Sequence, residues 1–227
     1  MIISKTPYRL SIFGGGTDYP SWYSKNKSEI ITAAIDNHCY LSIKNLPPYF
    51  SYKYRIAYSR IEMVSDIDDI DHPSVRNCLK YLNIDEGLSI THDGEIPARS
   101  GVGSSSAFTV GLLNALFRLK GVQLGKKDLA QKAIYVEQFL NEEAVGIQDQ
   151  IAAAYGGLNK ITAGPGRDWV VQPVKISDEY IKELESHILL GFCGKSRLSN
   201  THAKKQVNSI ERNKGILSEI QSVTKIG

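Results

Sequence analysis

The stretch "EIPARSGVGSSSAFTVG", residues 95–111, joins a glycine-rich turn to the start of an apolar run. Gly101 and Gly103 let the backbone turn tightly and approach a ligand without a Cβ in the way. The serines at 104–106 stand where a helix is expected to begin, and the free N–H groups of a first helical turn favour an anion. The stretch predicts a phosphate-binding loop that lacks the Walker A lysine, although a plain helix N-cap after a flexible loop explains the same residues.

The composition is that of a soluble globular protein. The chain has 227 residues, enough for one large domain or one domain and part of another, with 42% hydrophobic and 22% charged residues. The net charge of +3 suits a small anionic substrate but is too weak to argue for nucleic acid. Three widely spaced cysteines are typical of free thiols in a reducing cytosol. With no signal-peptide pattern and no apolar run of about 20 residues, we expect a cytoplasmic protein with no membrane contact.

The order of expected elements indicates the fold class. Alternating apolar and polar residues predict strands over residues 2–13, 29–46, 51–59, 87–97, 157–164, 168–176 and 188–193. Apolar residues at helical spacing predict helices over residues 20–25, 72–84, 104–119, 125–141, 145–157 and 177–187, and a helical tail from 199 to 225. Strands, then a group of helices, then strands again are typical of an α+β fold with an antiparallel or mixed sheet.

Three motifs in this order resemble those of the GHMP kinases. The loop "IPARSGVGSSSA", residues 96–107, is similar to the P-x-x-x-G-L-G-S-S-A loop that wraps the triphosphate of ATP in that family. "TPYRLSIFGGGTDYP", residues 6–20, is similar to the first galactokinase motif, A-P-G-R-V-N-L-I-G-E-H-T-D-Y. "VEQFLNEEAVGIQDQ", residues 136–150, is similar to the family's helix pair that ends in G-I-M-D-Q. Together the motifs span about two-thirds of the chain.

The resemblance implies a fold and a nucleotide site. It implies a GHMP kinase N-terminal domain (ribosomal protein S5 domain 2-like) over residues 1–175 and the start of a ferredoxin-like C-terminal domain over residues 176–227. Members of the family are usually longer, so we expect the chain to be truncated. The ATP contacts carried over from the family are Pro97, Arg99, Ser100, Gly101, Val102, Gly103, Ser104, Ser105 and Ser106.

The resemblance also assigns the chemistry. Asp149 would be the catalytic base toward a sugar hydroxyl, and Arg9 would hold it ionised and neutralise charge in the transition state. Glu137 would bind Mg²⁺ together with Ser105. The alternatives without a catalytic role are an exposed aspartate near a helix N-terminus, a surface ion pair and a solvated helix glutamate. The neighbouring Glu142 and Glu143 also compete for the metal role.

The substrate is implied by where the sequence departs from galactokinase. Asp18 would hydrogen-bond sugar hydroxyls, beside Gly15, Gly16 and Thr17, unless the glycines form a plain turn. Glycines replace the Glu–His pair of the galactokinase motif, so a larger sugar fits better. The pattern looks like the branch of the family that phosphorylates the C1 hydroxyl of D-glycero-D-manno-heptose 7-phosphate, an early step toward nucleotide-activated heptose for surface polysaccharide, with fucokinase as a relative.

The substrate phosphate needs a cationic partner. We expect it from Lys195 and Arg197, which fall in a loop between a predicted strand and helix, although a solvated basic turn explains them as well. The partners implied are Mg·ATP and a sugar phosphate, with no nucleic acid and no membrane, and a homodimer stays open. Three hypotheses follow: a heptose 7-phosphate kinase, another sugar kinase such as a fucokinase, and a non-catalytic protein that binds a nucleotide or a sugar phosphate.

Overall fold

The computed structural model describes residues 1–98, 100–191, 207, 209–210 and 212–225, apart from the side chain of residue 167. The strands are β1 (Ile2–Phe13), β2 (Ser28–Asn45), β3 (Tyr54–Ala57), β4 (Ile61–Val64), β5 (Leu88–Gly94), β6 (Leu158–Gly164) and β7 (Arg167–Pro173). The helices are α1 (Pro20–Tyr23), α2 (Pro73–Tyr81), α3 (Ser104–Leu119), α4 (Lys126–Tyr135), the π-helix η1 (Val136–Leu140), α5 (Gln148–Tyr155), α6 (Asp178–Ser186) and α8 (Lys214–Thr224).

A single mixed sheet organises these elements. The long strand β2 pairs with β1 along most of its length, with β5 at its C-terminal half and with β6 at its N-terminal half. The sheet runs in the order β4-β3-β5-β2-β6-β7, with β1 paired to β2 off this path. Only β3 and β5 are parallel among the described strand pairs, and the connection between them passes through β4 and α2. The predicted α+β class with a mixed sheet is confirmed.

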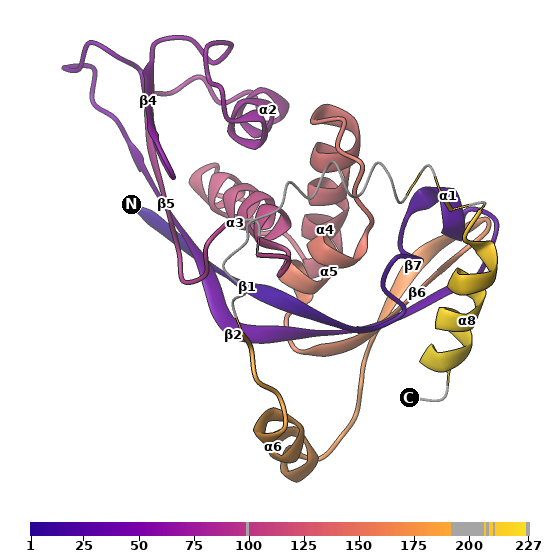
Figure 1. The fold of residues 1–227 in the computed structure, drawn as a ribbon. Coiled ribbons are helices and arrows are strands. Elements are labelled where there is room, and N and C mark those ends of the chain that lie inside the picture. The colour runs from indigo at the N-terminus through magenta and orange to yellow at the C-terminus, as the bar shows by residue number, and fades with distance from the viewer. Residues whose placement is uncertain (99, 192–206, 208, 211, 226–227) are drawn as a thin grey trace.

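Helix α3 is the centre of the hydrophobic core and brings its N-terminus to β1. Leu112, Leu113 and Leu116 are fully enclosed between the sheet and the neighbouring helices. The helix approaches β1 closely at Gly111, where an added Cβ would lie 2.7 Å from Thr6 Oγ1. Helices α3, α4 and α5 cover one face of the sheet (Figure 1). This packing sets the start of α3, and the loop before it, beside β1.

Several predicted elements differ from the structure. The predicted helix over residues 125–141 is divided into α4 and the π-turn η1, which widens the helix just where Glu137 lies. The short strand β4 was missed, because the acidic residues that follow it favoured a loop. The predicted buried strand over 188–193 is wrong for 188–191, which form no strand, and Leu189 is 95% exposed. The rest of that stretch lies outside the described residues.

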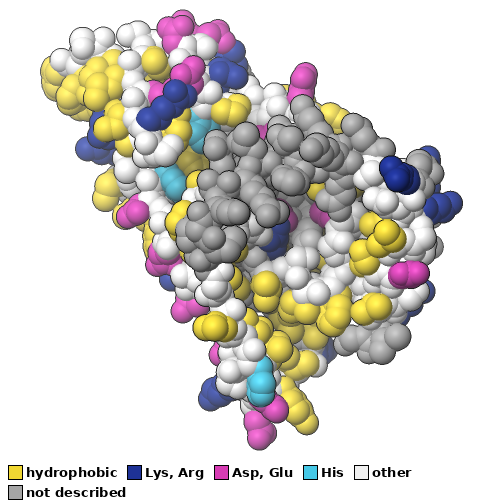
Figure 2. Space-filling view, in the orientation of Figure 1, with side chains coloured by type: hydrophobic (Ala, Val, Ile, Leu, Met, Phe, Trp, Pro, Cys, Tyr) yellow, Lys and Arg dark blue, Asp and Glu magenta, His cyan; other side chains and the backbone are white. Residues whose placement is uncertain are grey.

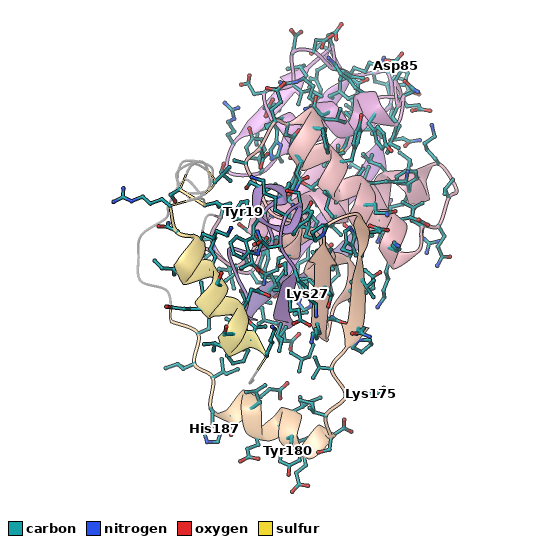
Figure 3. All side chains as sticks on the ribbon, turned by 90° about the vertical axis from the view of Figure 1, so that its right-hand side faces the viewer. Tyr19, Lys27, Asp85, Lys175, Tyr180 and His187 are labelled. Carbon is teal, nitrogen blue, oxygen red and sulfur yellow. The ribbon has the colours of Figure 1, made fainter. Side chains whose placement is uncertain are left out.

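The C-terminal part shows two contrasting helices. Helix α6 follows Ser177, whose side chain accepts the Tyr180 N–H, and it stands away from the sheet (Figure 1). Helix α8 instead packs beside α1 and the loop that carries Tyr19, where Leu217 joins Trp22 in a small apolar cluster (Figure 3). Within the described ranges, no helix combines the length and the apolar character that crossing a membrane requires. The division at residue 175 stays a prediction.

Candidate active site

The glycine–serine loop lies directly on β1. Gly101 and Gly103 have positive φ angles of 80° and 73°, and Gly103 is the N-cap of α3. The Val102 carbonyl accepts the Arg9 N–H at 3.0 Å. A Cβ at Gly103 would lie 3.1 Å from Arg9 Cγ and 3.4 Å from Asp149 Oδ2. Glycine at 103 thus serves both the left-handed turn and the close approach to these two side chains.

Arg9 joins the loop to helix α5. Its Nε and Nη2 donate to the two carboxylate oxygens of Asp149 at 2.7 and 2.8 Å, and its Nη1 donates to the Gly101 carbonyl at 2.7 Å. Burial of Arg9 opposes its charge, but the Asp149 carboxylate outweighs that effect, and the pKa of Arg9 is raised. Charged atoms of both signs lie at the bottom of a hollow in the face shown in Figure 2. The predicted neighbourhood of Arg9 and Asp149 is therefore present.

The three serines after the loop point in different directions. Ser104 begins α3, Ser105 is exposed, and Ser106 is buried and donates to Glu137 Oε2 at 2.8 Å. Ser106, rather than Ser105, therefore points into the protein interior, because consecutive helical residues point about 100° apart. Ser105, expected beside Glu137, instead faces outward at the first turn of α3. The exposed Pro97 accepts a hydrogen bond from Ser100 Oγ and holds the start of the loop.

Glu137 is a fully buried carboxylate on η1. Its Oε2 accepts from Ser106 and from Gln150 Nε2, whereas its Oε1 is buried without a hydrogen-bond partner. Burial, and then the charge of Glu143, raise the pKa of Glu137 to about 7. An unsatisfied carboxylate oxygen beside the Ser106 hydroxyl is a donor set that suits Mg²⁺, which prefers oxygen ligands. The residues present therefore fit a magnesium ion.

Asp18 is a second buried carboxylate, at the end of the glycine loop after β1. Its oxygens accept the backbone N–H groups of Gly16 at 3.1 Å and Gln148 at 3.4 Å. Burial, followed by the charge of Asp149, raises the pKa of Asp18 to about 6 despite these hydrogen bonds. Gly146 makes room for it, since a Cβ there would lie 1.7 Å from Asp18 Oδ2. Asp18 is thus held against the N-terminus of α5 by Gln148, the residue that precedes Asp149 in the sequence.

The other predicted substrate residues divide into two kinds. Gly15 has little room for a side chain, because a Cβ would lie 2.8 Å from Ser11 Oγ, and Gly16 has a φ of 90° and donates to Asp18. Thr17 is fully buried, and its hydroxyl bonds the Gly14 carbonyl, Ser28 Oγ and Gln221 Nε2. The prediction that the Thr17 side chain contacts the sugar is therefore corrected: this side chain is buried and stabilises the loop between β1 and α1.

Two polar residues of this site were not predicted. Ser11 Oγ donates to Gln148 Oε1 at 3.2 Å, and Gln148 Nε2 is buried without a partner. A signal for Ser11 was available, since residues two apart on a strand share a face and Arg9 was already placed there. Gln148 had only its place before Asp149 as a signal. Arg99, Lys195 and Arg197 lie outside the described residues.

The comparison with protein families matches part of this chain. Residues 73–157 match the family described as GHMP kinases N terminal domain, and they contain the loop, Glu137 and Asp149. Among curated proteins, the D-glycero-alpha-D-manno-heptose 7-phosphate kinase of Campylobacter jejuni is 28% identical over 208 residues. That match covers 86% of this chain and 60% of the relative. The bifunctional fucokinase/GDP-fucose pyrophosphorylase of Arabidopsis thaliana is 28% identical over 62% of this chain and 14% of its own length.

Solved structures share the fold over almost the whole chain. A D-glycero-D-manno-heptose 1-phosphate kinase from Bacteroides thetaiotaomicron superposes with a TM-score of 0.73 at 23% identity, covering 97% of this chain and 74% of that one. The mevalonate kinase of Methanococcus jannaschii superposes with a TM-score of 0.67 at 21% identity, covering 99% and 71%. This chain spans 60% of the length of the Campylobacter jejuni relative. Residues 73–157 therefore match the N-terminal domain of the GHMP kinases, and the chain shares its fold with a heptose-phosphate kinase and a mevalonate kinase over almost its whole length.

Proposed function

We propose that this chain belongs to an ATP-dependent kinase that phosphorylates the C1 hydroxyl of D-glycero-D-manno-heptose 7-phosphate, giving the 1,7-bisphosphate. The observation that carries the proposal is the bidentate Arg9–Asp149 pair set against the Gly101 carbonyl. It supports phosphoryl transfer because one guanidinium links a carboxylate base to the loop that would hold the phosphates. The choice of sugar is supported by the resemblance to the Campylobacter jejuni heptose 7-phosphate kinase.

The nucleotide would bind across the start of α3. Backbone N–H groups of the first turn, at Ser104 and Ser105, favour the phosphate oxygens of ATP, and the helix dipole adds to this preference. Gly101 and Gly103 keep side chains off the phosphates. The side chain of Ser105 is exposed to solvent, so its hydroxyl is available to a phosphate or to the metal.

Mg²⁺ would be held by Glu137 with Ser105 or Ser106, and it would supply charge neutralisation to the phosphates of ATP. The unpartnered Oε1 of Glu137 supports this assignment. Because the pKa of Glu137 is raised to about 7, the carboxyl exchanges a proton near neutral pH. Metal binding would therefore compete with that proton and strengthen as the pH rises.

The acceptor hydroxyl would lie between Asp149 and Asp18. Asp149 would accept its proton, with Arg9 orienting the carboxylate and then balancing the charge that develops on the transferred group. Asp18 would accept hydrogen bonds from other sugar hydroxyls. Gly15 leaves little room for a galactokinase-type glutamate, since a Cβ there would lie 2.8 Å from Ser11 Oγ.

The test is ADP release with Mg·ATP and a panel of sugars: D-glycero-D-manno-heptose 7-phosphate, heptose 1-phosphate, unphosphorylated heptose, fucose, galactose and mannose. We expect turnover with the 7-phosphate and a product phosphorylated at C1. The 1-phosphate serves as the matched control, because its C1 oxygen is already blocked. Turnover that requires fucose instead would move the assignment to a fucokinase, which the Arabidopsis thaliana relative supports. Binding without turnover on any sugar would favour a non-catalytic protein.

A further inference from the structure

A glutamine near the C-terminus is buried against the sugar loop. Gln221 on α8 is 8% exposed, in the face of the helix that also buries Leu217. Its Oε1 accepts the Glu29 N–H at 2.7 Å, and its Nε2 donates to the Glu29 carbonyl at 2.9 Å. The same Nε2 donates to Thr17 Oγ1 at 2.8 Å. One side chain therefore joins α8, strand β2 and the loop that leads to Asp18.

The contacts of Gln221 replace a missing strand. β1 pairs with β2 only as far as Phe13, opposite Ile31, and the chain then leaves the sheet at Gly14. The Glu29 peptide lies beyond that point, with its N–H and C=O directed to the side that β1 would have covered. A buried peptide without a partner costs about as much as a lost hydrogen bond. The Gln221 amide, which offers one acceptor and one donor side by side, satisfies both groups.

The same contacts fix where the loop leaves the sheet. Gly14 lies so close to Glu29 that a Cβ would be 2.1 Å from the Glu29 carbonyl oxygen. Thr17 Oγ1 donates to the Gly14 carbonyl at 2.7 Å and receives the Gln221 hydrogen bond, so it closes the loop at both ends. Asp18 follows at once, with its carbonyl accepting the Ile147 N–H at 3.1 Å. Gln221 lies 203 positions from Asp18 in the sequence. It can influence the position of Asp18 through the loop that Thr17 closes.

We propose that Gln221 is a positioning residue for the sugar site: through Glu29 and Thr17 it sets the loop that presents Asp18, while the phosphate loop stays independent of it. The role in sugar binding rests on the proposed kinase function, whereas the hold on the loop does not. None of the hydrogen bonds described for Gln221 reaches Arg9, residues 101–103 or Glu137. Loss of the Gln221 amide should therefore weaken the binding of the sugar and leave the binding of ATP unchanged.

The test compares Gln221→Met, which keeps the length of the side chain but removes its polar atoms, with Ser222→Ala on the same helix. Ser222 is an exposed neighbour whose hydroxyl bonds only the preceding turn at Ser218 among its described contacts. We expect Gln221→Met to raise KM for the sugar at least about tenfold, the loss of roughly one such hydrogen bond, with KM for ATP changed less than about twofold. Ser222→Ala should leave both constants unchanged. Equal changes in the two constants, or none, would overturn the proposal.

A second measurement does not depend on turnover. Hydrogen exchange of the backbone amides at 14–18 should become faster in Gln221→Met, while exchange at 101–103 stays as in the unchanged protein. If the kinase assay fails on every sugar but this exchange pattern appears, the proposed function is wrong and the positioning role stands. Unchanged exchange at 14–18 would overturn the role outright. Should Gln221→Met fail to fold, Gln221→Glu keeps the acceptor for Glu29 and removes both donations, and the same exchange pattern is expected.

Discussion

Arg9 and Asp149 face each other with two parallel hydrogen bonds, 2.7 and 2.8 Å long, although 140 residues separate them in sequence. The remaining nitrogen of the same guanidinium holds the Gly101 carbonyl. Strand β1 supplies the arginine, α5 the carboxylate and the loop before α3 the carbonyl. A guanidinium suits this position because its planar fork can satisfy a carboxylate and a carbonyl at once.

Asp149→Asn should lower kcat by at least about 100-fold while ATP binding persists, because the amide cannot accept the proton of the sugar hydroxyl. Asp128→Asn is the matched control, since Asp128 also lies in the first turn of a helix but is exposed on α4. Steady-state turnover and nucleotide binding by calorimetry would be measured on both variants. A kcat within about tenfold of the unchanged protein would show that Asp149 is no base.

Arg9→Lys should reduce kcat at least about tenfold, because a lysine ammonium cannot replace three directed hydrogen bonds, and charged hydrogen bonds are worth about 1.5–3 kcal/mol each. The control is Arg60→Lys, whose arginine is half exposed and pairs with Asp71 at 2.9 Å near the surface. Turnover is again the measurement, combined with a melting curve to separate lost folding from lost chemistry. Equal activity of the two lysine variants would contradict the role.

Sequence patterns predicted the regular elements well where one face of a segment was buried. β1 and α3 have the predicted bounds: β1 alternates loosely between apolar and polar residues, and α3 has apolar residues at helical spacing. The π-turn at η1 was not predictable, because it depends on fitting Glu137 between α3 and α5 rather than on local propensity. The exposed segment at 188–191 misled the prediction, because apolar residues indicate burial only if another element covers them.

The residues of the candidate site could be named from the sequence, whereas most of the contacts that support them could not. Arg9, Asp149, Asp18 and the loop could be named from motifs, since each carries a residue type that the chemistry needs. Which serine faces Glu137 depends on the rotation of α3 against η1, a tertiary property. Thr17 and Gln221 touch because β1 leaves the sheet early, and no local pattern records where a strand loses its partner.

Glu137→Gln should abolish most turnover and yet stabilise the protein at neutral and alkaline pH. The folded-state pKa of about 7 lies above the ordinary 4.5, so the unfolded chain releases the proton first and the folded state loses stability as the pH rises from about 4.5 to about 7. Glutamine carries no charge and removes this loss, which is of the order of 1–3 kcal/mol.

The measurement is the free energy of unfolding by urea at several pH values between 4 and 8, without added metal. The difference between Glu137→Gln and the unchanged protein should grow with pH across that window and then become constant. Glu142→Gln is the control, because Glu142 is exposed on the same segment. A difference that does not vary with pH would mean that Glu137 is not a buried acid with a raised pKa.

Gly146→Ala should damage the sugar site more than the nucleotide site. Its Cβ would lie 1.7 Å from Asp18 Oδ2 and 2.4 Å from Asp18 Cγ, so the carboxylate must leave the N–H groups of Gly16 and Gln148. We expect KM for the sugar to rise at least about tenfold and the protein to lose about 1–3 kcal/mol through overpacking. The control, Gly215→Ala, adds a Cβ with nothing within 4 Å and should be nearly neutral.

The double variant Gly146→Ala with Asp18→Ala separates the clash from the chemistry. Removing the Asp18 carboxylate takes away the two atoms that the new Cβ meets first, so the double variant should be more stable than Gly146→Ala alone. Its affinity for the sugar should stay low, because the carboxylate that binds the hydroxyls is gone. If stability returned together with sugar affinity, Asp18 would only fill space beside α5. If neither returned, the effect of Gly146→Ala would come from the backbone at the start of α5 and not from the Asp18 side chain.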